Sequence, residues 1–138
     1  MSDPLYAKDL LRLAAAAHGA GRLSPFDAEG TAHNPACGDR VGVTLRLGDT
    51  GRVTQIAHET HACVLAQASA SILGARLEGT DVAGVRDLRA RVASMLKEGA
   101  PPPAPFADYS VLAGAASFRN RHACVLLPID AVLKALEK

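Results

Sequence analysis

Two alternating segments joined by a tight turn constrain the fold of this chain more than any other feature. From residue 41 to residue 47, Val, Val, Leu and Leu alternate with Gly, Thr and Arg, which is the period of a strand with one buried face. Residues 48–51 read Gly-Asp-Thr-Gly, a turn sequence, and residues 52–59 supply a returning strand. The chain is therefore expected to contain an antiparallel hairpin with one face to bury.

Helical patterns lie on both sides of this hairpin. Helices are expected from about Asp3 to Ala17, from about Cys63 to Leu77, from about Val82 to Lys97, and from near Pro128 or Asp130 onward. Residues 22–33 read as a loop, and the weak signals up to Asn120 indicate a segment that wraps the surface. Helices that flank a short antiparallel sheet make an α+β fold, and 138 residues fit one domain spanning residues 1–138.

Composition narrows the classes of function. The 49% hydrophobic content supports a packed core, and 15 basic against 14 acidic side chains offer no field for gripping nucleic acid or an anionic membrane. No run of apolar residues is long enough to span a bilayer, and Asp3, Asp9 and Arg12 do not suit a signal peptide. We therefore expect a cytoplasmic protein with reduced thiols that binds neither nucleic acid nor membranes.

The segment from Asn34 to Asp39, Asn-Pro-Ala-Cys-Gly-Asp, carries the sharpest local signal. In extended backbone, residues two apart project to the same side, so the Cys37 thiolate and the Asp39 carboxylate can converge on one point. A thiolate and a carboxylate together suit a divalent metal such as zinc or iron. The alternative is a turn in which Asp39 bonds local backbone and Cys37 merely fills space.

Two further cysteines lie at predicted element boundaries. Cys63 begins a predicted helix, where unpaired N–H groups stabilise a thiolate, and Cys124 follows Arg121 and His122, whose charge favours thiolate over thiol. The alternative for each is a buried, inert thiol. Three thiolates and one carboxylate would complete a tetrahedral site. His61 and His122 each stand two residues before a cysteine and are spare-ligand candidates. The other three histidines are expected to be solvated or locally bonded: His18, His33 and His58.

Three motifs in order resemble the NifU/IscU/SufU-type iron–sulfur cluster assembly proteins. They are the segment 34–39, the Ala-Cys-Val-Leu-Ala-Gln-Ala-Ser-Ala-Ser of residues 62–71, and Leu-Ala-Gly at 112–114 followed by residues 121–127. The resemblance implies a SufE/NifU-like fold, a small antiparallel sheet packed against several helices, with the three cysteines at one exposed end. It also implies that Zn²⁺ or a [2Fe–2S] cluster is held by four ligands: Cys37, Asp39, Cys63 and Cys124.

Finer features resemble the zinc-binding SufU branch. Cys124 lies 61 positions after Cys63, a longer spacing than in the IscU branch, and Arg121 stands three residues before the last cysteine, as in SufU proteins. Ala123 occupies the place where the IscU branch has histidine, and that branch's Leu-Pro-Pro-Val-Lys segment is absent before Cys124. The resemblance therefore implies a member closest to the SufU branch.

Three functions are compatible with these residues. The resemblance implies a scaffold that accepts sulfur from a cysteine desulfurase and transfers a [2Fe–2S] cluster to apo iron–sulfur proteins, with Cys124 favoured as the sulfur acceptor. A zinc-dependent sulfurtransferase would instead accept persulfide sulfur at Cys37, with Arg121 stabilising the anion. A structural zinc domain that only binds partners is the third possibility, and a cysteine hydrolase is the least supported. Whether the chain is an enzyme stays open at this point.

Overall fold

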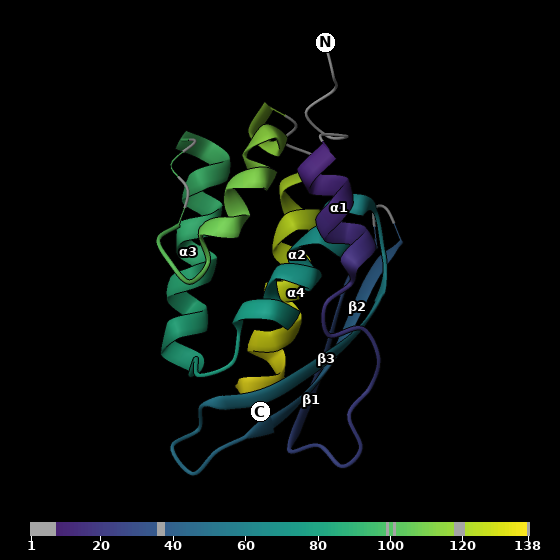
Figure 1. The fold of residues 1–138 in the computed structure, drawn as a ribbon, viewed down its shortest axis with the longest axis vertical. Coiled ribbons are helices and arrows are strands. Elements are labelled where there is room, and N and C mark those ends of the chain that lie inside the picture. The colour runs from purple at the N-terminus through teal and green to yellow at the C-terminus, as the bar shows by residue number, and fades with distance from the viewer. Residues whose placement is uncertain (1–7, 36–37, 99, 101, 118–120, 138) are drawn as a thin grey trace.

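The computed structural model describes residues 8–35, 38–98, 100, 102–117 and 121–137 of the chain. Along the sequence, the elements are α1 (Lys8–Ala16), β1 (Ala28–Asn34), β2 (Asp39–Leu47), β3 (Val53–His61), α2 (Val64–Arg76), α3 (Val82–Glu98), the 3₁₀ segment η2 (Ala107–Ser117) and α4 (His122–Leu136) (Figure 1). The strands form an antiparallel sheet in the order β1-β2-β3, and the helices gather on one side of it (Figure 1). The predicted α+β class is confirmed.

The β2–β3 hairpin is the predicted one, with β2 starting two residues earlier and β3 ending two residues later than expected. Val41, Val43 and Leu45 point into the core, as their alternation requires, and the register places Val43 opposite His58. The predicted second and third helices are also confirmed, since α2 and α3 begin and end within about a residue of the expected positions. The expected start of the first helix lies outside the described residues.

The prediction of a loop over residues 22–33 is wrong for its second half, where β1 forms the edge of the sheet. The residues of β1 that face the core are small, so they lack the large apolar signal of a strand. The reason for small residues is contact with α4: a Cβ added at Gly30 would lie 2.4 Å from the carbonyl oxygen of Ala131. Only glycine allows this close approach of a helix backbone to the strand.

The C-terminal part of the chain also differs from expectation. Helix α4 begins at His122, so Pro128 lies inside the helix and not at its start. Proline normally breaks a helix because it lacks the N–H and crowds the preceding turn, but here buried residues on both sides hold the helix together. The segment expected on the surface contributes to the core through η2, where Tyr109 and Leu112 are buried.

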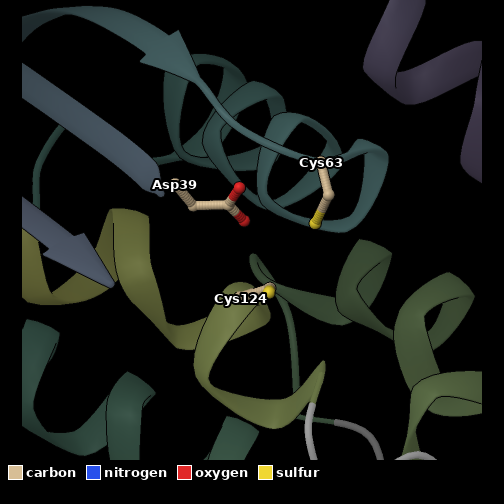
Figure 2. A group of neighbouring side chains, drawn as sticks. All are labelled: Asp39, Cys63 and Cys124. Atoms are coloured by element: carbon tan, nitrogen blue, oxygen red, sulfur yellow. The ribbon is translucent and has the colours of Figure 1, made fainter. Parts of the chain in front are cut away.

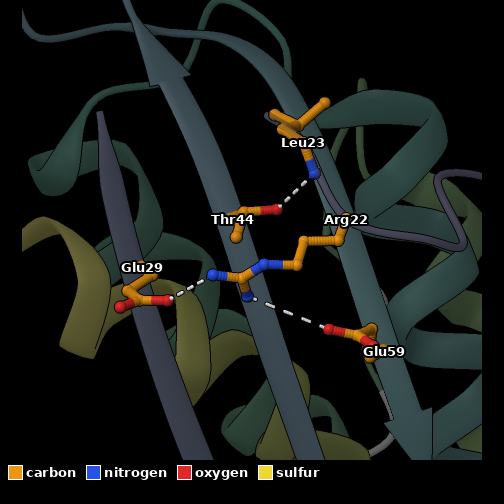
Figure 3. A network of polar contacts seen from close by, with 5 residues as sticks. All are labelled: Arg22, Leu23, Glu29, Thr44 and Glu59. Carbon is orange, nitrogen blue, oxygen red and sulfur yellow. Dashed lines mark hydrogen bonds and ion pairs between the residues drawn. The ribbon is translucent and has the colours of Figure 1, made fainter. Parts of the chain in front are cut away.

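The loop between α1 and β1 crosses the face of the sheet that the helices leave open (Figure 3). The backbone N–H of Leu23 donates to Thr44 Oγ1 at 3.0 Å. The guanidinium of Arg22 lies between Glu29 on β1, at 3.1 Å, and Glu59 on β3, at 3.9 Å (Figure 3). These contacts fix the loop across three strands.

The helices of the described chain show no membrane-spanning character. Helix α3, the longest, has 17 residues and carries charged side chains along its exposed side. Across residues 8–137, leaving aside the gaps given above, none of the helices joins the length and the apolar character that crossing a bilayer requires.

Candidate metal centre

Three side chains from distant parts of the sequence meet at one end of the sheet (Figure 2). Asp39 is the first residue of β2, Cys63 is the N-cap of α2, and Cys124 lies in the first turn of α4. One carboxylate oxygen and the two Sγ atoms all lie within 4.8 Å of one another. The convergence predicted for these three residues is therefore present in the structure.

Asp39 points into the molecule because of the alternation of β2. It shares the buried side of the strand with Val41 and Val43, and only 8% of it is exposed. Its Oδ2 atom is buried and has no hydrogen-bond partner within the described chain. Leaving a buried polar atom unsatisfied costs about 1–3 kcal/mol, so such an atom indicates a ligand or a functional role.

Cys63 stands where β3 ends and α2 begins. Its backbone is extended, with φ −65° and ψ 169°, and its side chain makes no capping hydrogen bond. The carbonyl oxygen accepts from the N–H of Gln67 at 3.0 Å, which starts the helix, while the half-buried thiol stays turned toward Asp39 (Figure 2). The predicted location of Cys63 at a helix start is confirmed.

Cys124 lies deeper than its sequence context indicates. The residue is 1% exposed. Burial raises the pKa of the Cys124 thiol, and the nearby Cys63 and Asp39 raise that pKa further. This direction is opposite to the one expected from the positions of Arg121 and His122 in the sequence, because desolvation of the buried anion disfavours the thiolate. A bound cation would reverse this balance, since metal binding displaces the thiol proton.

A buried hydrogen-bond network holds the two cysteine-bearing helices together. The Ser69 hydroxyl on α2 donates to the carbonyl oxygen of Val125, the residue after Cys124, at 2.8 Å. The Tyr109 hydroxyl from η2 then donates to Ser69 Oγ, also at 2.8 Å. The side chains of Ser69 and Tyr109 are fully buried, so these bonds fix α4 against α2 in a medium that excludes water.

The other candidate residues occupy different positions. Cys37 lies outside the described residues, so its place in the centre remains a prediction. Arg121 is the N-cap residue of α4 and is half-buried. His61 is exposed, and His122 is half-buried at the start of α4. Neither histidine belongs to the converging group found among the described side chains.

His58 is buried, so of the two alternatives predicted for it, solvated or locally bonded, the first is wrong and the second holds in part through Thr60. Its Nε2 lies 2.9 Å from the carbonyl oxygen of His18, and its Nδ1 lies 2.9 Å from Thr60 Oγ1. Burial lowers the pKa of His58, and the bond to His18 opposes this only in part. His58 therefore ties the end of α1 to β3, away from the metal-ligating group.

Sequence reasoning missed the Ser69–Tyr109 network. The sequence indicates that the serines of α2 are small residues that allow close helix packing, and both serines are indeed buried in the packed interior. The partner of Ser69 lies 40 residues further along the chain, in a segment without a regular pattern. No local signal could have paired them.

The donor set fits a metal ion. Ligands held at about 2.0–2.3 Å by a tetrahedral ion lie roughly 3.3–3.8 Å apart, so donors within 4.8 Å need only small side-chain movements to bind one. One carboxylate and two thiols are donors that zinc and iron accept.

Comparison with known proteins agrees with this geometry. The family model described as the NifU-like N terminal domain matches residues 5–125. The crystal structure of a nitrogen-fixing NifU-like protein (N-terminal) from Brucella abortus is 37% identical, with a TM-score of 0.90, over 98% of this chain and 94% of that one.

Two other relatives are more distant. A putative iron–sulfur cluster assembly scaffold protein for the SUF system from Fervidobacterium islandicum shares the fold, with a TM-score of 0.83 over 99% of both chains at 18% identity. The bifunctional protein NifU/MnmA of Rubrobacter xylanophilus is 32% identical over 69 residues, which are 50% of this chain and 14% of that protein. Because the family model covers most of the sequence and a solved relative covers nearly all of it, this chain belongs to the NifU-like N-terminal domain family.

Proposed function

We propose that this chain is a sulfur carrier of iron–sulfur cluster assembly that holds one Zn²⁺ ion. The observation that carries the proposal is the convergence of Asp39, Cys63 and Cys124, whose donor atoms lie within 4.8 Å of one another around an unsatisfied carboxylate oxygen. Cys37 is the proposed fourth ligand. In a two-iron cluster, ligands on different irons are separated by the cluster itself, so mutual closeness of three donors favours a single ion.

Cys37 is the proposed sulfur acceptor. Cys124 is almost fully buried and Cys63 is half-buried, so neither side chain is well placed to meet a persulfide carried by another protein. The Cys37 thiolate would attack the outer sulfur of a desulfurase persulfide. A new S–S bond forms at Cys37, the S–S bond of the desulfurase breaks, and its cysteine leaves as thiolate. Bound zinc would supply charge that keeps the ligating thiols deprotonated.

Arg121 is proposed to stabilise the anion at the centre. It stands three residues before Cys124, at the start of α4, and a guanidinium stays charged at any physiological pH. A neighbouring cation lowers the energy of a thiolate or persulfide anion. The proposed partners are a cysteine desulfurase as donor and apo iron–sulfur proteins as the final recipients.

The test measures sulfide release by a cysteine desulfurase supplied with cysteine and a reductant. Zinc-loaded native chain should stimulate the release, Cys37→Ser should abolish the stimulation, and Arg121→Ala should reduce it while zinc stays bound. His18→Ala, a change remote from the centre, is the matched control and should behave as the native chain. Full stimulation by Cys37→Ser would contradict the proposal.

A cluster scaffold is the second candidate, and the Asp39 donor favours it. A carboxylate oxygen is a harder and poorer partner for cluster iron than thiolate sulfur, so the Asp39 corner of a bound [2Fe–2S] cluster would be labile and would allow release. On this account Asp39→Ala lengthens the lifetime of a reconstituted cluster in air and slows transfer to an apo-ferredoxin. Faster decay in Asp39→Ala would count against the scaffold.

A further inference from the structure

The two edges of the sheet differ in whether other segments of the chain form hydrogen bonds with them. The outer edge of β3 is covered near its middle and at its start by backbone hydrogen bonds. Near its middle, the N–H of His58 donates to the carbonyl of Gly19 at 2.8 Å, and the N–H of Gly21 donates to the carbonyl of His58 at 2.8 Å. At its start, Val53 exchanges two such bonds with the Gly79–Thr80 turn.

The outer edge of β1 has no such cover in the part of the chain that the structure describes. β1 pairs with β2 alone, over a continuous register from Ala28 to Asn34 without a bulge. Proteins usually protect an open edge with charged side chains, above all lysine, with proline or with a bulge; β1 contains no lysine, proline or bulge, and its one acidic side chain is Glu29. A regular, unprotected edge is a template for one more strand.

A groove runs beside this open edge, between β1 and α4. Its volume is about 560 Å³, and its apolar walls come from Ala32, Leu127 and Leu133. Gly30 and Ala32 are the strand residues that face α4: the helix backbone packs directly against Gly30, and the small side chain of Ala32 lines the groove further along the strand. A strand added to β1 would extend the sheet and would cover part of this apolar surface.

We propose that β1 pairs with β1 of a second copy of this chain, antiparallel and centred on Thr31, to make one six-stranded sheet. The sequence of β1, Ala-Glu-Gly-Thr-Ala-His-Asn, is complementary to itself in this register. Glu29 lies opposite His33 of the second copy, Thr31 lies opposite Thr31, and Gly30 lies opposite Ala32. In a two-fold interface of this kind the Glu29–His33 and Gly30–Ala32 pairs each occur twice, and the Thr31 pair lies on the axis.

The side chains that would meet are free to do so. Glu29, Thr31 and His33 share the face of the strand that points away from α4, and Glu29 and His33 are exposed. Arg22 engages Glu29 through Oε2, so Oε1 can accept a hydrogen bond from the ring N–H of His33 in the second copy. Thr–Thr pairs directly across antiparallel strands stabilise the pairing, and the hydrogen bond between Glu29 and His33 adds to it.

Sedimentation velocity of the full chain over a range of concentrations tests the proposal. The native chain should form a dimer, and His33→Glu, which sets carboxylates opposite each other, should weaken the dimer by at least tenfold. The double variant Glu29→His with His33→Glu restores both pairs and should recover native dimerisation. The matched control is His61→Glu, the same change in the same cross-strand row at the opposite edge, and it should have no effect.

A cross-link tests the register independently. Facing residues of antiparallel strands lie close enough for a disulfide, so Thr31→Cys should give a covalent dimer under mild oxidation, whereas the native chain and Thr54→Cys, on β3, should not. A monomeric native chain at every concentration would overturn the proposal. Unchanged dimerisation of His33→Glu, or failure of the double variant to recover it while circular dichroism shows a native fold, would overturn the proposed register.

Discussion

Two groups of buried polar side chains in this small domain are treated in opposite ways. Ser69, Ser71 and His58 are buried and hydrogen-bonded. Ser69 bonds Val125 and Tyr109, and Ser71 accepts from the N–H of His18. His58 bonds the carbonyl of His18 and the hydroxyl of Thr60. Asp39 is buried as well, yet its Oδ2 has no hydrogen-bond partner among the described residues, and the thiols of Cys63 and Cys124 lie within 4.8 Å of its carboxylate. The first group joins elements of the fold, whereas the second leaves a donor set open.

The difference separates buried polar side chains that stabilise the fold from buried polar side chains that are available to bind a ligand. A satisfied buried network rigidifies the fold, and an unsatisfied carboxylate lowers the stability of the empty protein. The helices that carry the cysteines are held by the first group, because Ser69 on α2 bonds the carbonyl next to Cys124 on α4. The fold therefore stabilises the positions of the donors but not their charge.

The largest expected effect comes from removing a donor of the second group, Asp39, Cys63 and Cys124. Cys63→Ser and Cys124→Ser should each lower zinc affinity by more than the roughly 10–100-fold that loss of an outer-sphere partner costs, because a ligand itself is removed. The fold should survive without metal, since Cys124 and Cys63 are a small part of a core to which every helix and strand contributes. Competition with a chromophoric chelator measures the affinity, and circular dichroism measures the fold. A metal-free chain that unfolds would indicate a structural zinc site instead.

The next largest effect comes from removing a hydrogen bond of the first group, in which every buried polar side chain has a partner. Ser69→Ala removes a buried hydroxyl that bonds both Val125 and Tyr109, so the free energy of unfolding should fall by about 1–3 kcal/mol. Urea denaturation of the metal-free chain measures this change. Tyr109→Phe serves as the partner variant and should lose less, because Ser69 keeps its bond to Val125. Equal stability of Ser69→Ala and the native chain would show that the network contributes nothing.

A smaller effect of opposite sign is expected at Asp39. Asp39→Ala removes an unsatisfied buried carboxylate, so the metal-free chain should become more stable by up to about 1 kcal/mol, while zinc affinity falls. The same urea experiment, with Ser69→Ala as the contrast, shows whether the two groups differ in sign. Destabilisation by Asp39→Ala without metal would place Asp39 among the structural polar residues.

The smallest effect concerns pH. Burial lowers the pKa of His58 below its ordinary value of 6.5, so the unfolded chain takes up a proton before the folded chain does. The contribution of His58 is therefore complete above pH 6.5 and is lost as the pH falls from 6.5 through the folded-state pKa. His58→Gln should flatten this part of the curve of unfolding free energy against pH. An unchanged slope in His58→Gln would assign the dependence to other groups.

The sequence predicted the parts of the centre that depend on local backbone pattern. Asp39 and Cys63 are set by strand alternation and by a helix start, which can be recognised over a few residues. The surroundings of Cys124 could not be recognised in this way. Pro128 indicated a helix start, but packing of α4 against β1 keeps the helix continuous from His122 and buries the cysteine.

The errors in the fold have the same cause. The core-facing residues of β1 are small because α4 approaches the strand closely at Gly30, so the pattern of β1 exists only in relation to a helix about a hundred residues away. The core position of Tyr109 likewise depends on Ser69 and not on its own neighbours in sequence. Contacts between distant segments decide these positions, and one sequence does not contain them as a local signal.

X-ray absorption spectroscopy of the zinc-loaded chain is the most direct test of the central claim that Asp39 and the cysteines hold one ion. We expect a first shell of three sulfur atoms at about 2.3 Å and one oxygen at about 2.0–2.2 Å, with no second metal nearby. Asp39→Ala should change the oxygen contribution and leave the three sulfurs. A shell of nitrogen and oxygen alone, or a native spectrum unchanged in Asp39→Ala, would contradict the account.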